Sequence, residues 1–89
     1  MNTALMLAAR HDGLSVLPIE TVVADYFPHL AASQFRAQVR AGKIQGLPIM
    51  RMTDSQKSQG VHIEHLAKFI EERKREAEAE ARKLNGGNQ

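Results

Sequence analysis

The sequence predicts a mainly α-helical fold with a small β-hairpin, arranged as a winged helix-turn-helix with flanking N- and C-terminal helices. Three observations lead to this fold class. An amphipathic segment begins at Ile19, a second helical segment ends at Gly42, and two short alternating segments then flank the polar loop 53–60. The resulting order of helix, turn, helix and hairpin is the order of elements in a winged helix-turn-helix.

The length and composition of the chain limit what it can be. Eighty-nine residues suit one small domain with a modest core, and we expect residues 1–84 to form it and residues 85–89 to be a disordered tail. The chain has no cysteine, which excludes disulfides and thiolate metal sites. Its longest apolar run, 4–9, is too short to span a bilayer, and no secretory signal accompanies it. We therefore expect a cytoplasmic protein without membrane contact.

The first expected element is a helix that runs from an N-cap at Asn2 or Thr3 to about His11, where Asp12-Gly13 stops it. The apolar residues at 5–9 are consecutive instead of lying on one face. A helix that is apolar on all sides must bury more than one face. Its second face is covered either by another copy of the chain, which would make a homo-oligomer, or by a groove of its own domain.

A short strand at 15–17 and an amphipathic helix at 19–27 are expected next. Pro18 suits the first turn of a helix, and Pro28 ends the helix because the residue before a proline is driven out of helical geometry. The apolar side chains in between have the spacing of one helical face. They are Ile19, Val22, Val23, Tyr26 and Phe27.

After a turn at 29–30, in which Leu30 packs between two helices, a further helix is expected from Ala32 to Ala41. Gly42 is a good left-handed cap for its C-terminus. Phe35 and Val39 lie four residues apart, which is enough to dock this helix on the preceding one.

The remaining surface of this helix carries side chains that are suited to reading DNA. Glutamine and arginine make paired hydrogen bonds with the edges of adenine and guanine. An ordinary solvated helix face has much the same composition, and that interpretation stays open. The candidate major-groove residues are Gln34, Arg36, Gln38 and Arg40, with Ser33 at the start of the helix and Lys43 just after its end.

Two short alternating segments at 47–52 and 61–63 predict a β-hairpin around the loop 53–60. A loop of this length is a wing if it touches DNA and an idle hairpin tip if it does not. Its many hydrogen-bond donors favour the wing. These donors are Ser55, Gln56, Lys57, Ser58 and Gln59. We expect Lys43, Arg51, Gln56 and Lys57 to hold phosphates on either side of the reading helix.

The distribution of charge agrees with this arrangement. The formal net charge is +2, but the segment 33–60 carries five basic residues against one acidic residue, Asp54, and so has a charge of +4. From residue 61 onward acids and bases balance. The excess positive charge therefore falls on the proposed reading helix and wing, where phosphate contacts need it. Five cations on ordinary solvated surface are the competing explanation.

A long helix is expected from Glu64 onward. Its first two turns carry apolar residues that should pack on the domain, namely Leu66, Ala67, Phe69 and Ile70. Beyond them only a thin seam of Ala77, Ala81 and Leu84 continues among charges. This second half is either a solvated extension or a weak contact with another chain.

The sequence contains no pattern for catalysis. It has no Ser/His/Asp or Cys/His set, no glycine-rich phosphate loop after a strand and no evident pair of inward-facing carboxylates. His62, Glu64 and His65 lie close together, but the first falls on a strand and no third ligand has matching spacing. We therefore expect neither an enzyme nor a metal or other cofactor.

The chain resembles the pyocin activator protein PrtN family. The resemblance covers about residues 2–74 and is carried by NTALMLAAR, LPIETVVADYFPHL, VRAGKIQGLPIMRM and SQKSQGVHIEHLAKFIEERK. It implies a small transcriptional activator that binds promoter DNA of bacteriocin genes, and activation in turn implies contact with RNA polymerase. Ala31-Ala32 stands where the family often has Thr-Pro, which removes a good N-cap from the second helix.

Two other functions fit the same pattern of residues. The order of helices also resembles the wider excisionase and MerR-like winged-helix group, so the protein could bend DNA in an architectural role. It could also be a protein-interaction adaptor that does not bind DNA and presents its first helix or charged C-terminal helix to a partner.

Overall fold

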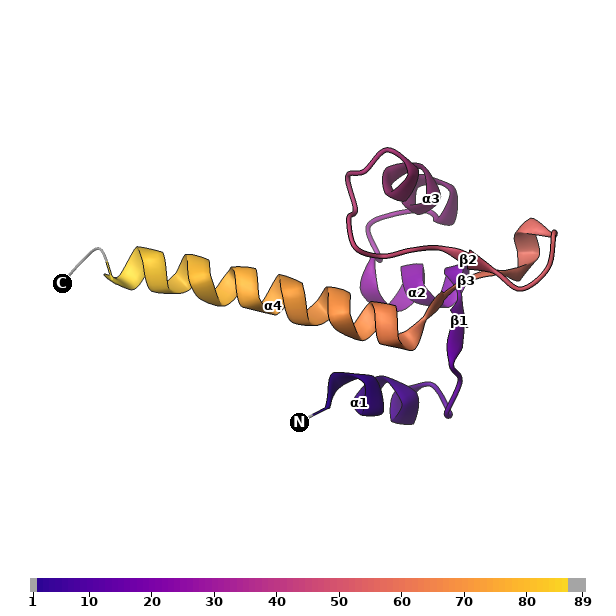
Figure 1. Ribbon diagram of the computed structural model, residues 1–89. Helices are drawn as coiled ribbons and strands as arrows, with labels where there is room; N and C mark the ends of the chain where they lie inside the picture. Colours follow the sequence, from indigo (N-terminus) through magenta and orange to yellow (C-terminus); the bar gives the residue numbers. More distant parts are fainter. Residues whose placement is uncertain (1, 87–89) are drawn as a thin grey trace.

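The computed structural model describes residues 2–86, which form helices around a small antiparallel sheet (Figure 1). The predicted fold class, mainly α with a small β-hairpin and flanking N- and C-terminal helices, is confirmed. In chain order the elements are α1 (Thr3–Arg10), β1 (Val16–Pro18), α2 (Ile19–Tyr26), α3 (Ala32–Arg40), β2 (Met50–Arg51), the 3₁₀ turn η1 (Gln56–Ser58), β3 (Gln59–His62) and α4 (Ile63–Gly86).

The sheet has the order β1-β3-β2, and both pairs of strands are antiparallel. The β2–β3 pair is the predicted hairpin, with Arg51 opposite Gln59. β1 pairs with the other edge of β3, with Leu17 opposite Val61, so the hairpin belongs to a three-stranded sheet. Within the strand expected at 47–52, only Met50 and Arg51 form a regular strand. These are the two residues that pair with β3, opposite Gly60 and Gln59.

The core lies between α2, α3, the sheet and the first turns of α4. The apolar face predicted for α2 is buried at Ile19, Val22 and Val23. Phe35 of α3 is fully buried, and its ring packs 5.0 Å from the ring of Phe27. Burial of one face of α3 in this way leaves its polar face turned outward.

The helix ends follow local sequence signals. The side chain of Asn2 caps α1 by accepting the N–H of Leu5 at 3.1 Å, as predicted. Gly42 after α3 has a φ of +79°, the left-handed conformation that a glycine cap adopts most readily. The N–H of Lys43 then donates to the carbonyl of Gln38 at 2.9 Å, which completes the cap.

Helix α1 lies on α4 and buries only part of its apolar surface. Leu7 points into the core, whereas Leu5 and Met6 remain 69% and 55% exposed. The hydroxyl of Thr3 donates a hydrogen bond to the carboxylate of Glu71 and so ties α1 to α4. The domain therefore supplies a groove for one face of α1, as one of the two sequence interpretations expected, and the outer face lies at the surface.

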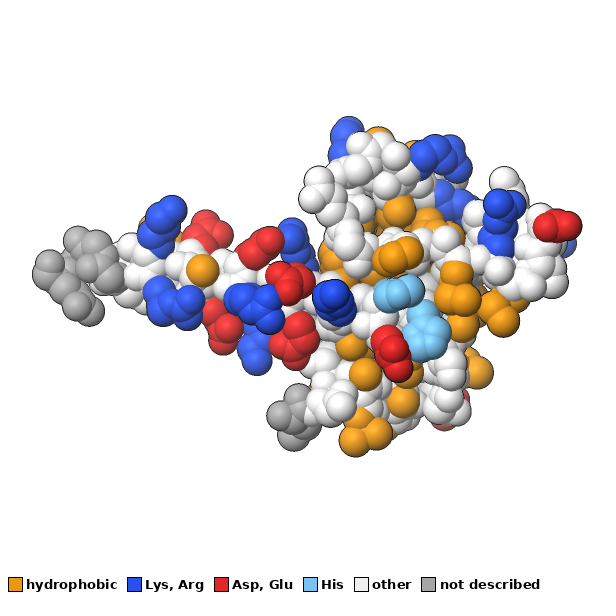
Figure 2. All heavy atoms as spheres, in the orientation of Figure 1, with side chains coloured by type: hydrophobic (Ala, Val, Ile, Leu, Met, Phe, Trp, Pro, Cys, Tyr) orange, Lys and Arg blue, Asp and Glu red, His pale blue; other side chains and the backbone are white. Residues whose placement is uncertain are grey.

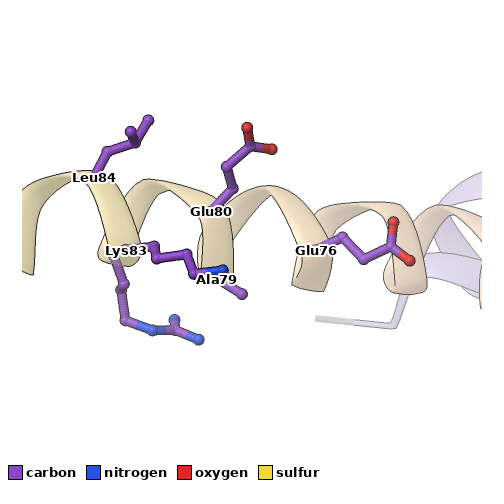
Figure 3. A pocket seen from close by; sticks show the side chains of 6 residues that line it. Glu76, Ala79, Glu80, Lys83 and Leu84 are labelled. Atoms are coloured by element: carbon purple, nitrogen blue, oxygen red, sulfur yellow. The ribbon is translucent and has the colours of Figure 1, made fainter.

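Helix α4 extends well beyond the domain (Figure 1). Its side chains are exposed from Glu72 onward, and acidic and basic groups are mixed along it (Figure 2). A shallow hollow near its end is lined by residues of α4 alone (Figure 3). The helix continues to Gly86, two residues into the segment predicted as a disordered tail, and residues 87–89 lie outside the described part. Among residues 2–86 no helix is both long and apolar enough to cross a membrane.

Candidate nucleic-acid interface

The start of α3 is capped by its own third residue. Ala31, at the N-cap position, has no side chain that could accept a hydrogen bond, and its backbone is extended. The side-chain oxygen of Gln34 instead accepts the N–H of Ala31 at 2.8 Å. This is one half of a capping box, and it compensates for the missing N-cap side chain. Gln34 thereby uses its carbonyl oxygen within the helix, while its amide nitrogen stays available.

The tip of the hairpin is organised by hydrogen bonds among its own residues. The hydroxyl oxygen of Ser58 accepts the N–H of Thr53 at 3.0 Å and lies 2.6 Å from the carbonyl oxygen of Ser55, to which it donates. The hydroxyl of Ser55 in turn accepts the N–H of Lys57 at 3.1 Å. The polar side chains of the tip thus fold the loop, and the exposed Lys57 is presented on a defined turn.

A polar hollow of about 370 Å³ lies between α3 and the hairpin. Its lining includes three arginines and no carboxylate. Basic side chains also gather on the surface over α3 and the hairpin (Figure 2). A concave surface of one charge raises the local concentration of an oppositely charged ligand. The residues that line the hollow are Arg36, Val39, Arg40, Ile49, Arg51, Gln56 and Gln59.

Arg36 is the most constrained of these arginines. Its Nε donates to the side-chain oxygen of Gln59 at 2.7 Å, and one of its terminal nitrogens lies 3.9 Å from Glu20. The Arg36 side chain is only 23% exposed. Arg36 therefore connects α3 to β3 and faces the first turn of α2, whereas Arg40 and Arg51 are exposed.

The nine site residues predicted from the sequence divide into two groups. Four of them line the hollow, namely Arg36, Arg40, Arg51 and Gln56. The other five do not line it: Ser33, Gln34 and Gln38 belong to α3, Lys43 follows its C-terminal cap and Lys57 belongs to η1. Gln59 was named among the hydrogen-bond donors of the loop but not among the nine site residues; it joins the hollow because it pairs with Arg51 across the hairpin. The hairpin register, had it been predicted, would have identified it.

Two titratable groups with shifted pKa values lie away from the hollow, beside α1. Burial raises the pKa of the Tyr26 phenol, with the Arg10 guanidinium opposing this effect. The hydrogen bond from Thr3 lowers the pKa of Glu71. The rings of His62 and His65, which the sequence places close together, have centres 5.9 Å apart. Within residues 2–86 no group of three or more His, Cys, Asp or Glu side chains is placed to hold a metal ion.

The family model described as pyocin activator protein PrtN matches residues 3–77 of the chain. The chain belongs to the PrtN family. The resemblance predicted from the sequence is therefore confirmed, and the matched region includes α3, the hairpin and all residues of the hollow. PrtN is a family of regulatory activators and not a family of enzymes. No curated protein and no solved structure shows a significant match to this PrtN family member.

Proposed function

We propose that this PrtN family protein is a cytoplasmic transcriptional activator that binds promoter DNA of bacteriocin genes in a sequence-specific manner. The observation that carries the proposal is the basic hollow between α3 and the hairpin. Three arginines and two glutamines, from parts of the chain up to 23 residues apart, converge there without a carboxylate in the lining. Phosphate groups and base edges are the ligands that such a set of donors recognises.

In this proposal α3 lies in the major groove. Arg40, which is exposed at the rim of the hollow, and Gln38 face base edges. Ser33 and the free amide nitrogen of Gln34 lie at the N-terminal end of the same helix, where a recognition helix makes many of its contacts. Arg36 lies at the floor of the hollow.

The hairpin supplies the second set of contacts. Arg51 and Gln56 line the hollow on the side opposite α3, and Lys57 stands on the ordered tip. Lys43 follows the C-terminal cap of α3. In the proposal these four residues hold phosphates on either side of the groove that α3 enters, which sets the orientation of the protein on the duplex.

Activation also requires contacts beyond DNA. We propose that the protein acts as a homo-oligomer, since a second copy would lengthen the binding site and raise its specificity. Leu5 and Met6, the exposed apolar residues of α1, are available for a protein contact. RNA polymerase is the partner that transcriptional activation implies.

The proposal is tested by selecting bound duplexes from a random DNA pool with the full chain and titrating the enriched duplex at two salt concentrations. An enriched motif and an affinity that falls steeply with salt support specific recognition, and the spacing of half-sites reports the number of subunits. No enrichment and no binding would overturn the proposal in favour of an adaptor. A bending assay beside a promoter reporter separates activation from an excisionase-like architectural role.

A further inference from the structure

The hairpin needs a fixed direction relative to α3 if both are to contact one duplex. The hydrogen bonds of the tip join residues 52–58 to one another, so they set the shape of the tip and not its direction. β2 has only two residues and pairs with β3 alone. β1 pairs with β3 only from Gly60 to His62, so the eight-residue loop beyond it is supported by the two residues of β2 alone.

A side-chain hydrogen bond at the start of β3 connects the hairpin to α3. The side chain of Gln59, the first residue of β3, accepts the 2.7 Å hydrogen bond from Nε of Arg36. Among residues 2–86 no other hydrogen bond joins α3 to the hairpin. Both side chains are partly buried, so water competes less for this bond than for one at the surface.

We propose that Arg36 and Gln59 form a positioning pair that sets the direction of the wing relative to α3. The guanidinium is planar and donates in a fixed direction, so the bond constrains orientation as well as distance. A terminal nitrogen of Arg36 also lies 3.9 Å from the exposed carboxylate of Glu20 on α2. Arg36 thus acts on DNA through Gln59 and the wing instead of through a base edge. Only this last consequence rests on the proposed function.

The first test uses the free protein and needs no DNA. Residual dipolar couplings of the backbone amides at 53–58 report the direction of the wing relative to α3. We expect Arg36→Met and Gln59→Met, which keep the apolar stems but remove the bond, to change these couplings and to leave those of α3 unaltered. Arg40→Met, which removes an exposed arginine from the same hollow, is the matched control and should change neither set. Gln59→Glu keeps an acceptor for Arg36 and should retain the wild-type direction.

Thermal unfolding of each variant shows whether a change in the couplings comes from a reoriented wing or from a less stable fold. Variants that unfold near the wild-type temperature yet reorient the wing support the pair. Wild-type couplings in both Met variants would overturn the proposal, whatever the protein does with DNA.

The second test measures affinity for the duplex enriched by the wild-type protein and for a random duplex of equal length. Each Met variant should bind the enriched duplex about three- to tenfold more weakly, which is the worth of one hydrogen bond. Arg36→Met/Gln59→Met should bind no more weakly than the weaker single variant, whereas the losses from Arg40→Met and Gln59→Met should multiply. If Arg36→Met alone altered the selected motif, Arg36 would be a base reader and the positioning role would be wrong. If no duplex binds, the proposed function fails. The residual dipolar couplings of the free protein still show whether Arg36 and Gln59 set the direction of the wing.

Discussion

The Nε2 atom of His11 lies 3.0 Å from the hydroxyl oxygen of Tyr26 and thereby joins the end of α1 to the last turn of α2. His11 is 8% exposed, the one buried polar side chain among the described residues. Asp25 lies 3.8 Å from the same nitrogen and 3.8 Å from Arg10. The buried imidazole therefore has polar partners at the junction of α1 and α2, and α1 is held to the domain at both of its ends.

Tyr26→Phe should lower the free energy of unfolding by about 1–3 kcal/mol, because it removes the hydroxyl partner of a buried imidazole nitrogen. Urea unfolding followed by circular dichroism measures the change. His65→Ala, at an exposed histidine of α4, is the control and should stay within about 0.5 kcal/mol of the wild type. A Tyr26→Phe variant as stable as the wild type would show that the hydrogen bond contributes nothing net.

Thr3→Val should lower the free energy of unfolding by an amount that depends on pH. The hydrogen bond from Thr3 holds the pKa of Glu71 below its ordinary value of 4.5, so the folded state favours the ionised carboxylate. That stabilisation is present above pH 4.5 and is lost as the pH falls through the lowered pKa. The difference in unfolding free energy between wild type and Thr3→Val should therefore shrink in acid. Ser33→Ala, an exposed control, should show a difference that does not depend on pH.

Gly60→Ala should destabilise the sheet. A Cβ atom at this position would lie 2.6 Å from the carbonyl oxygen of Leu17 and 2.8 Å from Cγ1 of Val16, so β1 would have to move away from β3. Overpacking of this kind costs about 1–3 kcal/mol. Urea unfolding measures the loss, and Gln45→Ala in an exposed turn serves as the control. Wild-type stability in Gly60→Ala would argue against the pairing of β1 with β3.

Arg40→Ala should weaken binding to the enriched duplex by about 1–3 kcal/mol if Arg40 contacts a base. Titration against the enriched duplex and a random duplex measures the effect, which should be much smaller on the random one. Lys83→Ala removes an exposed cation on the far half of α4 and should leave both affinities unchanged. Equal losses on the two duplexes would make Arg40 a phosphate contact.

Lys57→Ala should weaken binding to the enriched and random duplexes alike. The expected cause is the loss of one phosphate contact, which lowers the slope of log affinity against log salt by about 1. Titrations over a series of salt concentrations measure that slope for wild type and variant. A loss confined to the enriched duplex would mean that the tip of the hairpin reads sequence.

Much of the local structure could be predicted from short stretches of sequence. The spacing of Ile19, Val22 and Val23 identified the buried face of α2, and Gly42 ends α3 in the left-handed conformation expected of it. The long helix that follows β3 was also expected, although it begins at Ile63 and reaches Gly86. In each case a residue responds to neighbours within a turn or two of chain, which the sequence displays directly.

The order and type of the elements, the excess of positive charge on α3 and the hairpin, and the family of the chain could all be predicted from the sequence. The pairing of β1 with β3, the place of Gln59 in the hollow and the hydrogen bond that holds Arg36 to Gln59 became evident only in the folded chain. Helix periodicity and caps depend on neighbouring residues. Strand partners and contacts between side chains on different elements depend instead on how the whole chain packs, and no short stretch of sequence encodes that arrangement.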